Sequence, residues 1–460
     1  MIQQETATKC DYNAQELELL SQPVPRYTSY PPVPAWNKEV IQTCVSDSLA
    51  YLSKSGDFSA LYIHIPFCQK LCWYCGCNTQ VQKDTSAAEP YLSALIKEMQ
   101  IIARNGHINI NEIHFGGGTP NFLSAQQFHR LFCAIEQNFG LSRKSKISIE
   151  ADPRTLTELH LETYALNNIK RLSLGVQDFN LEVQKAINRI QPYEMIKTHT
   201  ESARQRGFDS INFDLIVGLP KQTVESFEET LELALSLKPD RFALFNFAYM
   251  PEQRKHMKLI KAEDLPSSET KIQCTLMARN KFIEAGYVEI GLDHFALAND
   301  ELALAAKKKK LYRNFMGFTV NQSPNVIGIG SSSISETKDY FWQNERELNS
   351  YLKNILEDQL PLSGGHHKSE EDQQRAWIIQ SLMCNLHMDT REFKEIFHCD
   401  PKIIFADSYR KLKTDIPHYL YTGGEGDVLQ IHADSKLFSR LIASCFDARS
   451  TKSNPMSTSL

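Results

Sequence analysis

Short apolar runs rich in β-branched residues recur every few tens of residues along the chain. They cover residues 60–67, 110–115, 146–150, 171–176, 211–217, 241–248 and 287–292. Each has the length and composition of a buried strand. Helical periodicity fills the gaps between them; one stretch places Leu92, Leu95, Ile96, Met99 and Ile102 on one face. Buried strands that alternate with amphipathic helices predict an α/β fold with a parallel sheet covered by helices.

Glycine and polar residues follow several of these predicted strands. They are Gly116-Gly117-Gly118-Thr119, Glu150-Ala151-Asp152, Gln177-Asp178 and Gly218-Leu219-Pro220. A barrel and a doubly wound sheet both accommodate the β-α repeat. Barrel enzymes collect their chemistry at the carboxyl ends of the strands, so this pattern favours a parallel barrel with about six β-α units.

The segments that flank the repeat differ from it in composition. Five prolines surround Arg26-Tyr27-Thr28-Ser29-Tyr30, which predicts an extended segment. Ser363-Gly364-Gly365-His366-His367 is typical of a linker with exposed histidines, and a helical region with a hairpin around residues 423–426 follows it. The expected domains are an N-terminal extension that covers the active site (1–59), the barrel (60–362), a small mainly helical domain (363–448) and a disordered tail (449–460).

Charge and hydropathy exclude several classes of function. The 50 Lys plus Arg against 55 Asp plus Glu give a net charge of −5, which disfavours non-specific nucleic-acid binding. The run Lys307–Lys310 is expected to be solvent-exposed. No window reaches the length of about 18 apolar residues that a membrane span needs, and residues 1–11 lack the pattern of a signal peptide. We therefore expect a cytoplasmic protein.

Four of the eleven cysteines fall within ten residues, at Cys68, Cys72, Cys75 and Cys77. An odd total in a chain of this kind disfavours a disulfide framework. Structural zinc would require four ligands, usually in two separated pairs. Soft thiolate ligands suit an iron–sulfur cluster better. If three cysteines hold a four-iron cluster, one iron is open to a small molecule. Spacing alone leaves Cys77 either a fourth ligand or a bystander.

The spacing Cys68-x-x-x-Cys72-x-x-Cys75 after the first strand resembles that of radical S-adenosylmethionine (SAM) enzymes. Further segments make the chain similar, over residues 26–447, to the oxygen-independent coproporphyrinogen III oxidase (coproporphyrinogen dehydrogenase) family within that superfamily. These segments are Arg26-Tyr27-Thr28-Ser29-Tyr30-Pro31, His64-Ile65-Pro66-Phe67, Cys75-Gly76-Cys77-Asn78, Gly116-Gly117-Gly118-Thr119-Pro120, Glu150-Ala151-Asp152-Pro153, Gly175-Val176-Gln177-Asp178-Phe179, Asn188-Arg189, Asp214-Leu215-Ile216, Asp293-His294-Phe295 and Arg313-Asn314-Phe315.

The resemblance implies a partial (β/α)6-type barrel, one [4Fe-4S] cluster and two SAM molecules. Cys68, Cys72 and Cys75 would be the cluster ligands, and these residues with Tyr62 would be catalytic. The cluster-bound SAM would contact Tyr62, Tyr74, Gly117, Glu150 and Ile334. The second SAM would contact Gly118, Thr119, Gln177, Arg189, Asp214 and Ala248. The residue types by themselves support two of these contacts. Glycines allow a ligand to approach the backbone closely, and a carboxylate at a strand end can accept hydrogen bonds from ribose hydroxyls.

The reaction implied by the family is the oxidative decarboxylation of two propionates of coproporphyrinogen III to vinyl groups, which gives protoporphyrinogen IX in haem biosynthesis. A 5′-deoxyadenosyl radical would remove a hydrogen from each propionate β-carbon. The implied partners are the tetrapyrrole substrate and an unidentified electron donor and acceptor, and the chain is expected to act as a monomer. Arg26 and Arg313 are candidates to bind the carboxylates of the substrate.

One departure from the family pattern keeps alternatives open. Met316 stands where the family usually has Gln after Arg313-Asn314-Phe315. The alternatives are a haem-binding or haem-trafficking relative, a radical SAM haem-degrading methyltransferase, and a simple iron–sulfur electron carrier. The trafficking relatives generally lack the segment 26–31 and carry an aromatic residue at the position of Cys77. This chain has the segment 26–31 and has Cys77 instead of an aromatic residue, as the oxidases do.

Overall fold

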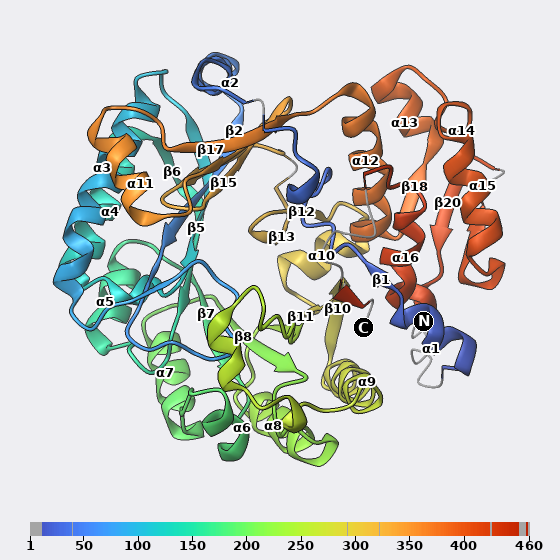
Figure 1. Cartoon of the computed structure of the whole chain (residues 1–460), viewed down its shortest axis with the longest axis horizontal. Coiled ribbons are helices and arrows are strands. Elements are labelled where there is room, and N and C mark those ends of the chain that lie inside the picture. The colour runs from blue at the N-terminus through green and yellow to red at the C-terminus, as the bar shows by residue number, and fades with distance from the viewer. Residues whose placement is uncertain are drawn as a thin grey trace. The chain divides into compact units, whose positions relative to one another are not determined.

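The computed structural model describes residues 12–38, 40–291, 293–321, 323–423, 426–449 and 457–458. The chain divides into two compact units (Figure 1). The sheet unit comprises Asn37–Thr270 and Ser323–His367, and the helical unit comprises Met1–Trp36, Lys271–Gln322 and Lys368–Leu460. Each unit is therefore described by itself.

Parallel strands and the helices between them form most of the sheet unit. The strands are β2 (Phe58–Ile65), β5 (Asn109–Gly117), β6 (Gly140–Ala151), β7 (Arg171–Gln177), β8 (Ser210–Val217) and β9 (Arg241–Asn246). They pair in this order, all in parallel. The predicted strands between residues 60 and 248 are confirmed, and so is the parallel α/β arrangement.

Helices connect these strands and cover the sheet. They are α3 (Glu89–Ala103), α4 (Ala125–Asn138), α5 (Glu158–Leu166), α6 (Leu181–Ala186), α7 (Tyr193–Gln205) and α8 (Val224–Ser236). Figure 1 shows α3, α4, α5 and α7 on the outer side of the strands. The helix predicted from Leu92 to Ile102 is α3. Helix α4 begins with a capping box, in which Ser124 and Gln127 each accept the backbone N–H of the other.

The core of the sheet unit lies between the strands and these helices. Phe115 of β5, Phe128 of α4 and Tyr164 of α5 are fully buried. Their rings are in contact, with centroid separations of 4.9 Å for Phe115 and Phe128 and 4.7 Å for Phe128 and Tyr164. Such aromatic pairs add to the free energy gained by burying apolar area. The packing of these helices on the strands thus buries the apolar side chains that predicted the sheet.

The sheet continues past β2 instead of closing into a full barrel. Strand β14 (Val326–Ile329) pairs in parallel with β2, and β15 (Ile334–Glu336), β16 (Tyr340–Asn344) and β17 (Leu362–His367) follow in antiparallel order. The sheet order is linear. The expected partial barrel is therefore confirmed, and an antiparallel extension that the β-α pattern did not indicate is added to it. Helix α2 (Gln42–Ser55) precedes β2, and α11 (Leu348–Leu356) follows β16.

The predicted linker at residues 363–367 is wrong, because these residues belong to β17. Phe341 pairs with His366 and Trp342 with Gly365. A side chain at Gly365 would place its Cβ 2.2 Å from the Phe341 carbonyl oxygen, so the glycine serves close strand pairing rather than a turn. The ring of His366 is buried, and its Nδ1 accepts the Asn37 N–H at 3.3 Å. His367 is exposed, as expected.

The helical unit has its own core. Its helices include α9 (Ser268–Glu284), α10 (Glu301–Lys307), α12 (Glu370–Asn385), α13 (Thr390–Phe397), α14 (Pro401–Ile404), α15 (Ala406–Asp415) and α16 (Ser439–Ser444). Strands β18 (His387–Asp389), β20 (Val428–Ile431) and β19 (Tyr421–Gly423) form an antiparallel sheet in that order. The predicted hairpin around 423–426 is confirmed by the pairing of β19 with β20; residues 424 and 425 lie outside the described part. The run Lys307–Lys310 is exposed, as predicted.

Two short hairpins complete the helical unit. Strand β10 (Tyr287–Gly291) pairs antiparallel with β11 (His294–Leu297), and β12 (Tyr312–Asn314) with β13 (Gly317–Thr319). The strand predicted at 287–292 exists as β10, but it is not a further repeat of the parallel β-α unit. Leu292 lies outside the described residues.

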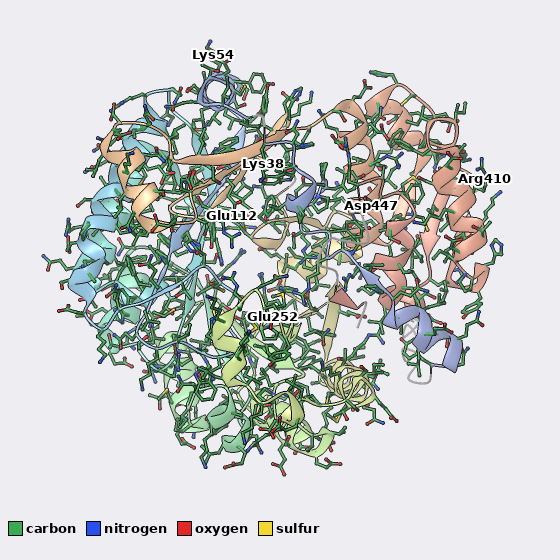
Figure 2. The ribbon with its side chains drawn as sticks, in the orientation of Figure 1. Lys38, Lys54, Glu112, Glu252, Arg410 and Asp447 are labelled. Atoms are coloured by element: carbon green, nitrogen blue, oxygen red, sulfur yellow. The ribbon has the colours of Figure 1, made fainter. Side chains whose placement is uncertain are left out.

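The proline-rich N-terminal segment is extended, as predicted, and lies within the helical unit. It contains β1 (Pro23–Val24) and the 3-10 turn Val33–Ala35. Its Tyr27 hydroxyl donates to Asp447 at 3.0 Å, and its Tyr30 hydroxyl accepts the Ala448 N–H at 3.0 Å (Asp447 is labelled in Figure 2). The helix α1 (Ala14–Ser21) before it was not predicted.

The segment predicted to be a disordered tail is described only in part. Ser457–Thr458 (β21) pairs with β1, and residues 450–456 and 459–460 lie outside the described part. Among the described helices, none combines the length and the hydropathy required to span a membrane.

Candidate active site

The cysteine cluster follows directly on β2. Cys68 ends β3 (Phe67–Cys68), which pairs with β4 (Gln80–Val81), and Cys72 and Cys75 lie in the loop between these strands. Cys68 and Cys72 are buried, Cys75 is half-buried and Cys77 is exposed, and all four are free thiols. The backbone N–H of Cys75 donates to the Cys72 carbonyl at 3.1 Å. The loop therefore holds several thiols close to the carboxyl end of one central strand.

Hydrogen-bond donors surround two of the sulfur atoms. Cys68 Sγ lies 3.1 Å from both Thr119 Oγ1 and Thr79 Oγ1. Cys72 Sγ accepts from Arg154 Nη2 at 3.2 Å and from Arg189 Nη1 at 3.4 Å. Donors of this kind stabilise the thiolate form that binds metal. Sequence reasoning singled out Thr119 and Arg189 but missed Arg154 and Thr79.

A buried carboxylate orients both arginines. Asp152 Oδ2 lies 2.6 Å from Arg154 Nη2 and 3.3 Å from Arg189 Nη1. The three side chains are 10% exposed or less. Burial opposes ionisation of Asp152, but the charges of Arg189 and Arg154 outweigh it and lower the pKa of Asp152 to about 2. The ionised carboxylate thus fixes two guanidinium groups beside Cys72.

Hydrogen bonds and burial shift the pKa values of cysteine thiols in this loop. A side-chain hydrogen bond with Cys77 lowers the pKa of the Cys75 thiol to about 7. Burial raises the pKa of Cys68, and the hydrogen bonds from Thr119 and Thr79 oppose that rise. The loop itself is held by His256, whose Nε2 lies 2.8 Å from the Cys75 carbonyl oxygen.

The donor set near the end of β2 consists of thiols. Among the described residues, no group of three or more His, Cys, Asp or Glu side chains is placed to hold a metal ion. The thiols of Cys68, Cys72 and Cys75 are nevertheless close enough to interact electrostatically. Soft sulfur ligands, each reaching a separate metal, are what an iron–sulfur cluster requires.

A glycine turn at the end of β5 brings backbone close to the end of β2. Gly117 has φ +115°, and a Cβ there would lie 2.8 Å from the His64 ring. The Gly118 N–H donates to the Ile65 carbonyl at 2.8 Å, and a Cβ at Gly118 would lie 3.0 Å from the Phe67 carbonyl oxygen. Only glycine permits this approach, which leaves peptide groups beside the cysteine loop.

A second polar cluster lies on neighbouring strands of the sheet. Strand register places Tyr62 of β2 opposite His114 of β5, and the two rings stack with centroids 6.0 Å apart. His114 Nε2 lies 3.0 Å from Glu150 Oε1, and His114 Nδ1 lies 2.8 Å from Ser148 Oγ. The Glu150 side chain remains 43% exposed, so its carboxylate can meet a ligand while His114 orients it.

His64 extends this cluster toward the cysteine loop. Its Nδ1 lies 3.1 Å from the Tyr62 hydroxyl, and its Nε2 lies 3.1 Å from the Asn78 carbonyl oxygen. Sequence reasoning named Tyr62 and Glu150 as site residues, gave His64 only as part of a family segment, and did not name His114. The alternation of Tyr62 and His64 on one strand and the direct pairing of β2 with β5 were the signals that could have found them.

Two buried polar atoms near the end of β7 have no hydrogen-bond partner among the described residues. A bulge interrupts the register between Gly175 and Gln177, and Gln177 has φ +65°. Arg189 Nη2 donates to the Gly175 carbonyl at 2.7 Å. Gln177 Oε1 and Arg189 Nε are buried, and neither has a hydrogen-bond partner within the described residues. Buried polar atoms without partners commonly mark a place where a ligand or water binds.

The other site residues named from the sequence occupy more varied positions in the sheet unit. Asp214 of β8 accepts from Ser173 Oγ at 3.1 Å. Tyr74 packs against a small apolar cluster that includes Ile187 and Leu219. Ala248 is exposed just after β9, and Ile334 is the half-buried first residue of β15. The residues named from the sequence for the cluster and for SAM belong to the sheet unit, whereas Arg26 and Arg313, the candidates to bind substrate carboxylates, belong to the helical unit.

Comparisons with known proteins agree with this geometry. The family model described as the radical SAM superfamily matches residues 62–234. The oxygen-independent coproporphyrinogen III oxidase of Bradyrhizobium diazoefficiens is 36% identical over 427 residues, which cover 92% of this chain and 94% of that protein. The protein of the same name from Pseudomonas aeruginosa is 38% identical over 395 residues, 85% of each chain. A solved structure of the Escherichia coli coproporphyrinogen III oxidase, described as a radical SAM enzyme, has a TM-score of 0.89 at 36% identity and covers 95% of this chain and 99% of that one.

Proposed function

Because this chain belongs to the oxygen-independent coproporphyrinogen III oxidases of the radical SAM superfamily, we propose that it decarboxylates two propionates of coproporphyrinogen III to vinyl groups in haem biosynthesis. The observation that carries the proposal is the grouping of thiols, glycine turn and Glu150 at the carboxyl ends of β2, β5 and β6. At each propionate, a hydrogen leaves the β-carbon, carbon dioxide is released and one electron passes to an acceptor.

Cys68, Cys72 and Cys75 are the proposed ligands of one [4Fe-4S] cluster. Membership of the radical SAM family implies this cluster together with SAM. The cluster and SAM, when bound, supply a 5′-deoxyadenosyl radical. The donors to Cys68 Sγ and Cys72 Sγ support the assignment, because they favour thiolates at these positions. Cys77 is exposed and hydrogen-bonded to Cys75, which suits a neighbour of the cluster rather than a ligand.

Two SAM molecules are proposed, with separate sets of contacts. The cluster-bound SAM would be held by Tyr62, Tyr74, Gly117, Glu150 and Ile334. The second SAM would be held by Gly118, Thr119, Gln177, Arg189, Asp214 and Ala248. The support for the first is the glycine turn beside the cysteine loop and the accessible Glu150 carboxylate. The support for the second is the buried Gln177 Oε1, which a ligand donor would satisfy.

The wider setting of the reaction is also a proposal. We expect a cytoplasmic monomer. It would take electrons from a donor and pass electrons to an acceptor, and the sequence identifies neither the donor nor the acceptor. We propose that the N-terminal extension, residues 1–59, covers the active site, because a primary carbon radical must be kept from water and stray hydrogen donors.

The decisive experiment is an anaerobic incubation of reconstituted protein with coproporphyrinogen III, SAM and dithionite. We expect vinyl product and 5′-deoxyadenosine from the wild type and from Cys133→Ala, and neither from Cys68→Ala, Cys72→Ala or Cys75→Ala. Deoxyadenosine without vinyl product would indicate another substrate, and a parallel incubation with haem would reveal methyl transfer to haem. An intact cluster that yields neither product would favour haem binding or trafficking. Loss of all iron in Cys77→Ala would contradict the three-ligand assignment.

A further inference from the structure

Residues 176–178 form a tight turn at the carboxyl end of β7. The Asp178 N–H donates to the Val176 carbonyl at 2.8 Å, and Gln177 between them has φ +65°. This hydrogen bond and this φ are those of a γ-turn with positive φ, which is rare and strained. Strain of this kind persists only where the surrounding contacts hold it, and it gathers at ligand sites.

The carboxylate of Asp178 supplies several of these contacts. Asp178 is fully buried. Its Oδ1 accepts the Asn180 N–H at 2.7 Å and the Thr230 hydroxyl at 2.9 Å, and its Oδ2 accepts from Gln222 Nε2 at 2.7 Å. Burial raises the pKa of Asp178 to about 6, and these three hydrogen bonds oppose the rise. All three partners are donors, which is the pattern that an ionised carboxylate requires.

Gln222 and Thr230 attach the turn to the next strand and its helix. Gln222 lies in the loop after β8, where its Oε1 accepts the Gly218 N–H at 2.7 Å. Thr230 lies in α8, and its Oγ1 accepts the Phe179 N–H at 3.1 Å. Groups from outside β7 therefore set the position of Asp178.

Two glutamines hold the backbone carbonyls of the same turn. Gln184 Nε2 donates to the Asp178 carbonyl at 2.9 Å, and Gln191 Nε2 donates to the Val176 carbonyl. The Gln191 N–H donates in turn to Gln184 Oε1 at 2.9 Å, and both side chains are buried. Side chains thus hold the turn on both sides of Gln177, and none of these bonds uses the side chain of Gln177 itself.

The Gln177 side chain lies beside that of Arg189. A Cβ at Gly175 would lie 2.7 Å from Gln177 Nε2 and 2.8 Å from Arg189 Nη2, so both side chains lie over this glycine. Gln177 Oε1 and Arg189 Nε are buried, and neither has a hydrogen-bond partner in the part of the chain that the structure describes. A buried acceptor and a buried donor on neighbouring side chains indicate that a polar ligand binds there.

We propose that Asp178 is a positioning residue for the second SAM, because its carboxylate holds the turn that directs Gln177 to this ligand. The inference rests on the proposed function, which assigns Gln177 and Arg189 to the second SAM. It goes beyond that function, since both oxygens of Asp178 bind protein donors and act on the ligand only through Gln177.

Asp178→Asn tests the inference. The amide places an NH2 group where the carboxylate now accepts, so at least one of its three donors loses its partner. Gln222 cannot compensate by turning its own amide, because its Oε1 accepts the Gly218 N–H. Anaerobic equilibrium dialysis of reconstituted protein with labelled SAM should give two SAM per chain for the wild type. In Asp178→Asn the second SAM should bind about tenfold more weakly or worse.

Two further measurements distinguish positioning from a structural role. Iron content and the formation of 5′-deoxyadenosine with dithionite should stay at the wild-type level in Asp178→Asn, because other residues hold the cluster and its SAM. A general loss of structure would lower both.

Thr230→Val is a second variant, which removes one donor to Asp178 with little change of shape and decides the question if Asp178→Asn does not fold. Its control is Thr200→Val. Thr200 of α7 is also buried, and its hydroxyl donates within the helix to the Ile196 carbonyl at 2.8 Å. Asp209→Asn, at an exposed position before β8, is the control for the change of charge. Both controls should bind two SAM like the wild type.

The outcomes separate this inference from the proposed function. Two SAM bound with wild-type affinity in both Asp178→Asn and Thr230→Val would overturn the inference and leave the proposed function standing. Parallel losses of iron, deoxyadenosine and both SAM would also overturn it, because they would show a structural role. A wild type that binds one SAM would overturn it together with the assignment of two SAM. If the wild type binds two SAM, Asp178→Asn loses one of them and coproporphyrinogen III is not decarboxylated, the proposed function is refuted and the role of Asp178 stands.

Discussion

Arg154 binds both carboxylate oxygens of Asp152 and places its Nη2 3.2 Å from Cys72 Sγ. The two residues are neighbours in the turn after β6, so the sheet fixes their distance from the cysteine loop. Asp152 neutralises part of the arginine charge and holds the guanidinium plane. Groups that hydrogen-bond to a metal ligand control the affinity and the reduction potential of the site. Arg154 is therefore a positioning residue for Cys72.

Replacement of Arg154 should weaken the cluster without unfolding the protein. In Arg154→Gln we expect iron binding, or the activity that depends on it, to fall by about 10- to 100-fold. Loss of a charged N–H donor to sulfur should also lower the midpoint potential of the cluster. Iron and sulfide analysis after reconstitution and an EPR-monitored redox titration measure both effects. Arg143→Gln, at an exposed position on β6, is the control; equal values in the two variants would contradict the role of Arg154.

Gly117 should tolerate no side chain. Its φ of +115° strains other residues, and a Cβ would lie 2.8 Å from the His64 ring. Gly117→Ala should destabilise the protein by about 1–3 kcal/mol and reduce SAM affinity, because the turn must shift. Thermal unfolding and equilibrium dialysis with labelled SAM check this. Gly426→Ala is the comparison, since Gly426 has ordinary backbone geometry and open space around it. A Gly117→Ala protein with normal stability and SAM affinity would refute the argument.

The parallel strands were predictable because buried strands leave a local signal. In residues 110–115, Ile110, Ile113 and Phe115 are buried, and residues 171–176 likewise contain buried apolar positions, so each strand carries its own local apolar signal. The same holds for the cysteine spacing and the glycine run, which occupy neighbouring positions in the sequence. These features needed no knowledge of contacts between distant residues.

Contacts between distant residues account for what the sequence did not reveal. Gly364-Gly365 has the composition of a turn, yet Gly365 is required where β17 pairs closely with β16. The contact of Arg154 with Cys72 joins positions 82 residues apart. The boundaries expected at residues 60 and 363 follow the order of the chain, whereas the compact units are built from separate segments; those boundaries stay a prediction.

His114 should control SAM binding through Glu150. Its Nε2 lies 3.0 Å from Glu150 Oε1, and its ring stacks on Tyr62. In His114→Asn the carboxylate would lose a partner and become less ordered, which should weaken SAM binding by about tenfold while iron content stays normal. Anaerobic calorimetry on reconstituted protein measures the affinity. His129→Asn, an exposed histidine of α4, should bind SAM normally. Loss of iron in His114→Asn would point to a structural role instead.

Glu98 should make stability depend on pH. This glutamate of α3 is 1% exposed. Its Oε2 accepts from the Tyr351 hydroxyl at 2.6 Å and from the Gly330 N–H at 2.8 Å, and its Oε1 accepts from Asn344 Nδ2 at 2.6 Å. Burial raises the pKa of Glu98 from 4.5 to about 7 despite these hydrogen bonds. The folded state therefore keeps a proton that the unfolded state releases near pH 4.5.

The sign of the effect follows from that difference in bound protons. Between about pH 4.5 and 7 the folded state binds more protons, so the free energy of unfolding falls as pH rises, by about 3 kcal/mol from this group. Glu98→Gln carries no such proton, so its stability relative to the wild type should rise by a similar amount between pH 4.5 and 8. Urea unfolding at a series of pH values measures this difference. Glu136→Gln, at an exposed position on α4, is the control: its free energy of unfolding should differ from that of the wild type by the same amount at every pH. If Glu98→Gln also showed a pH-independent difference, Glu98 would be ionised in the folded protein throughout this range.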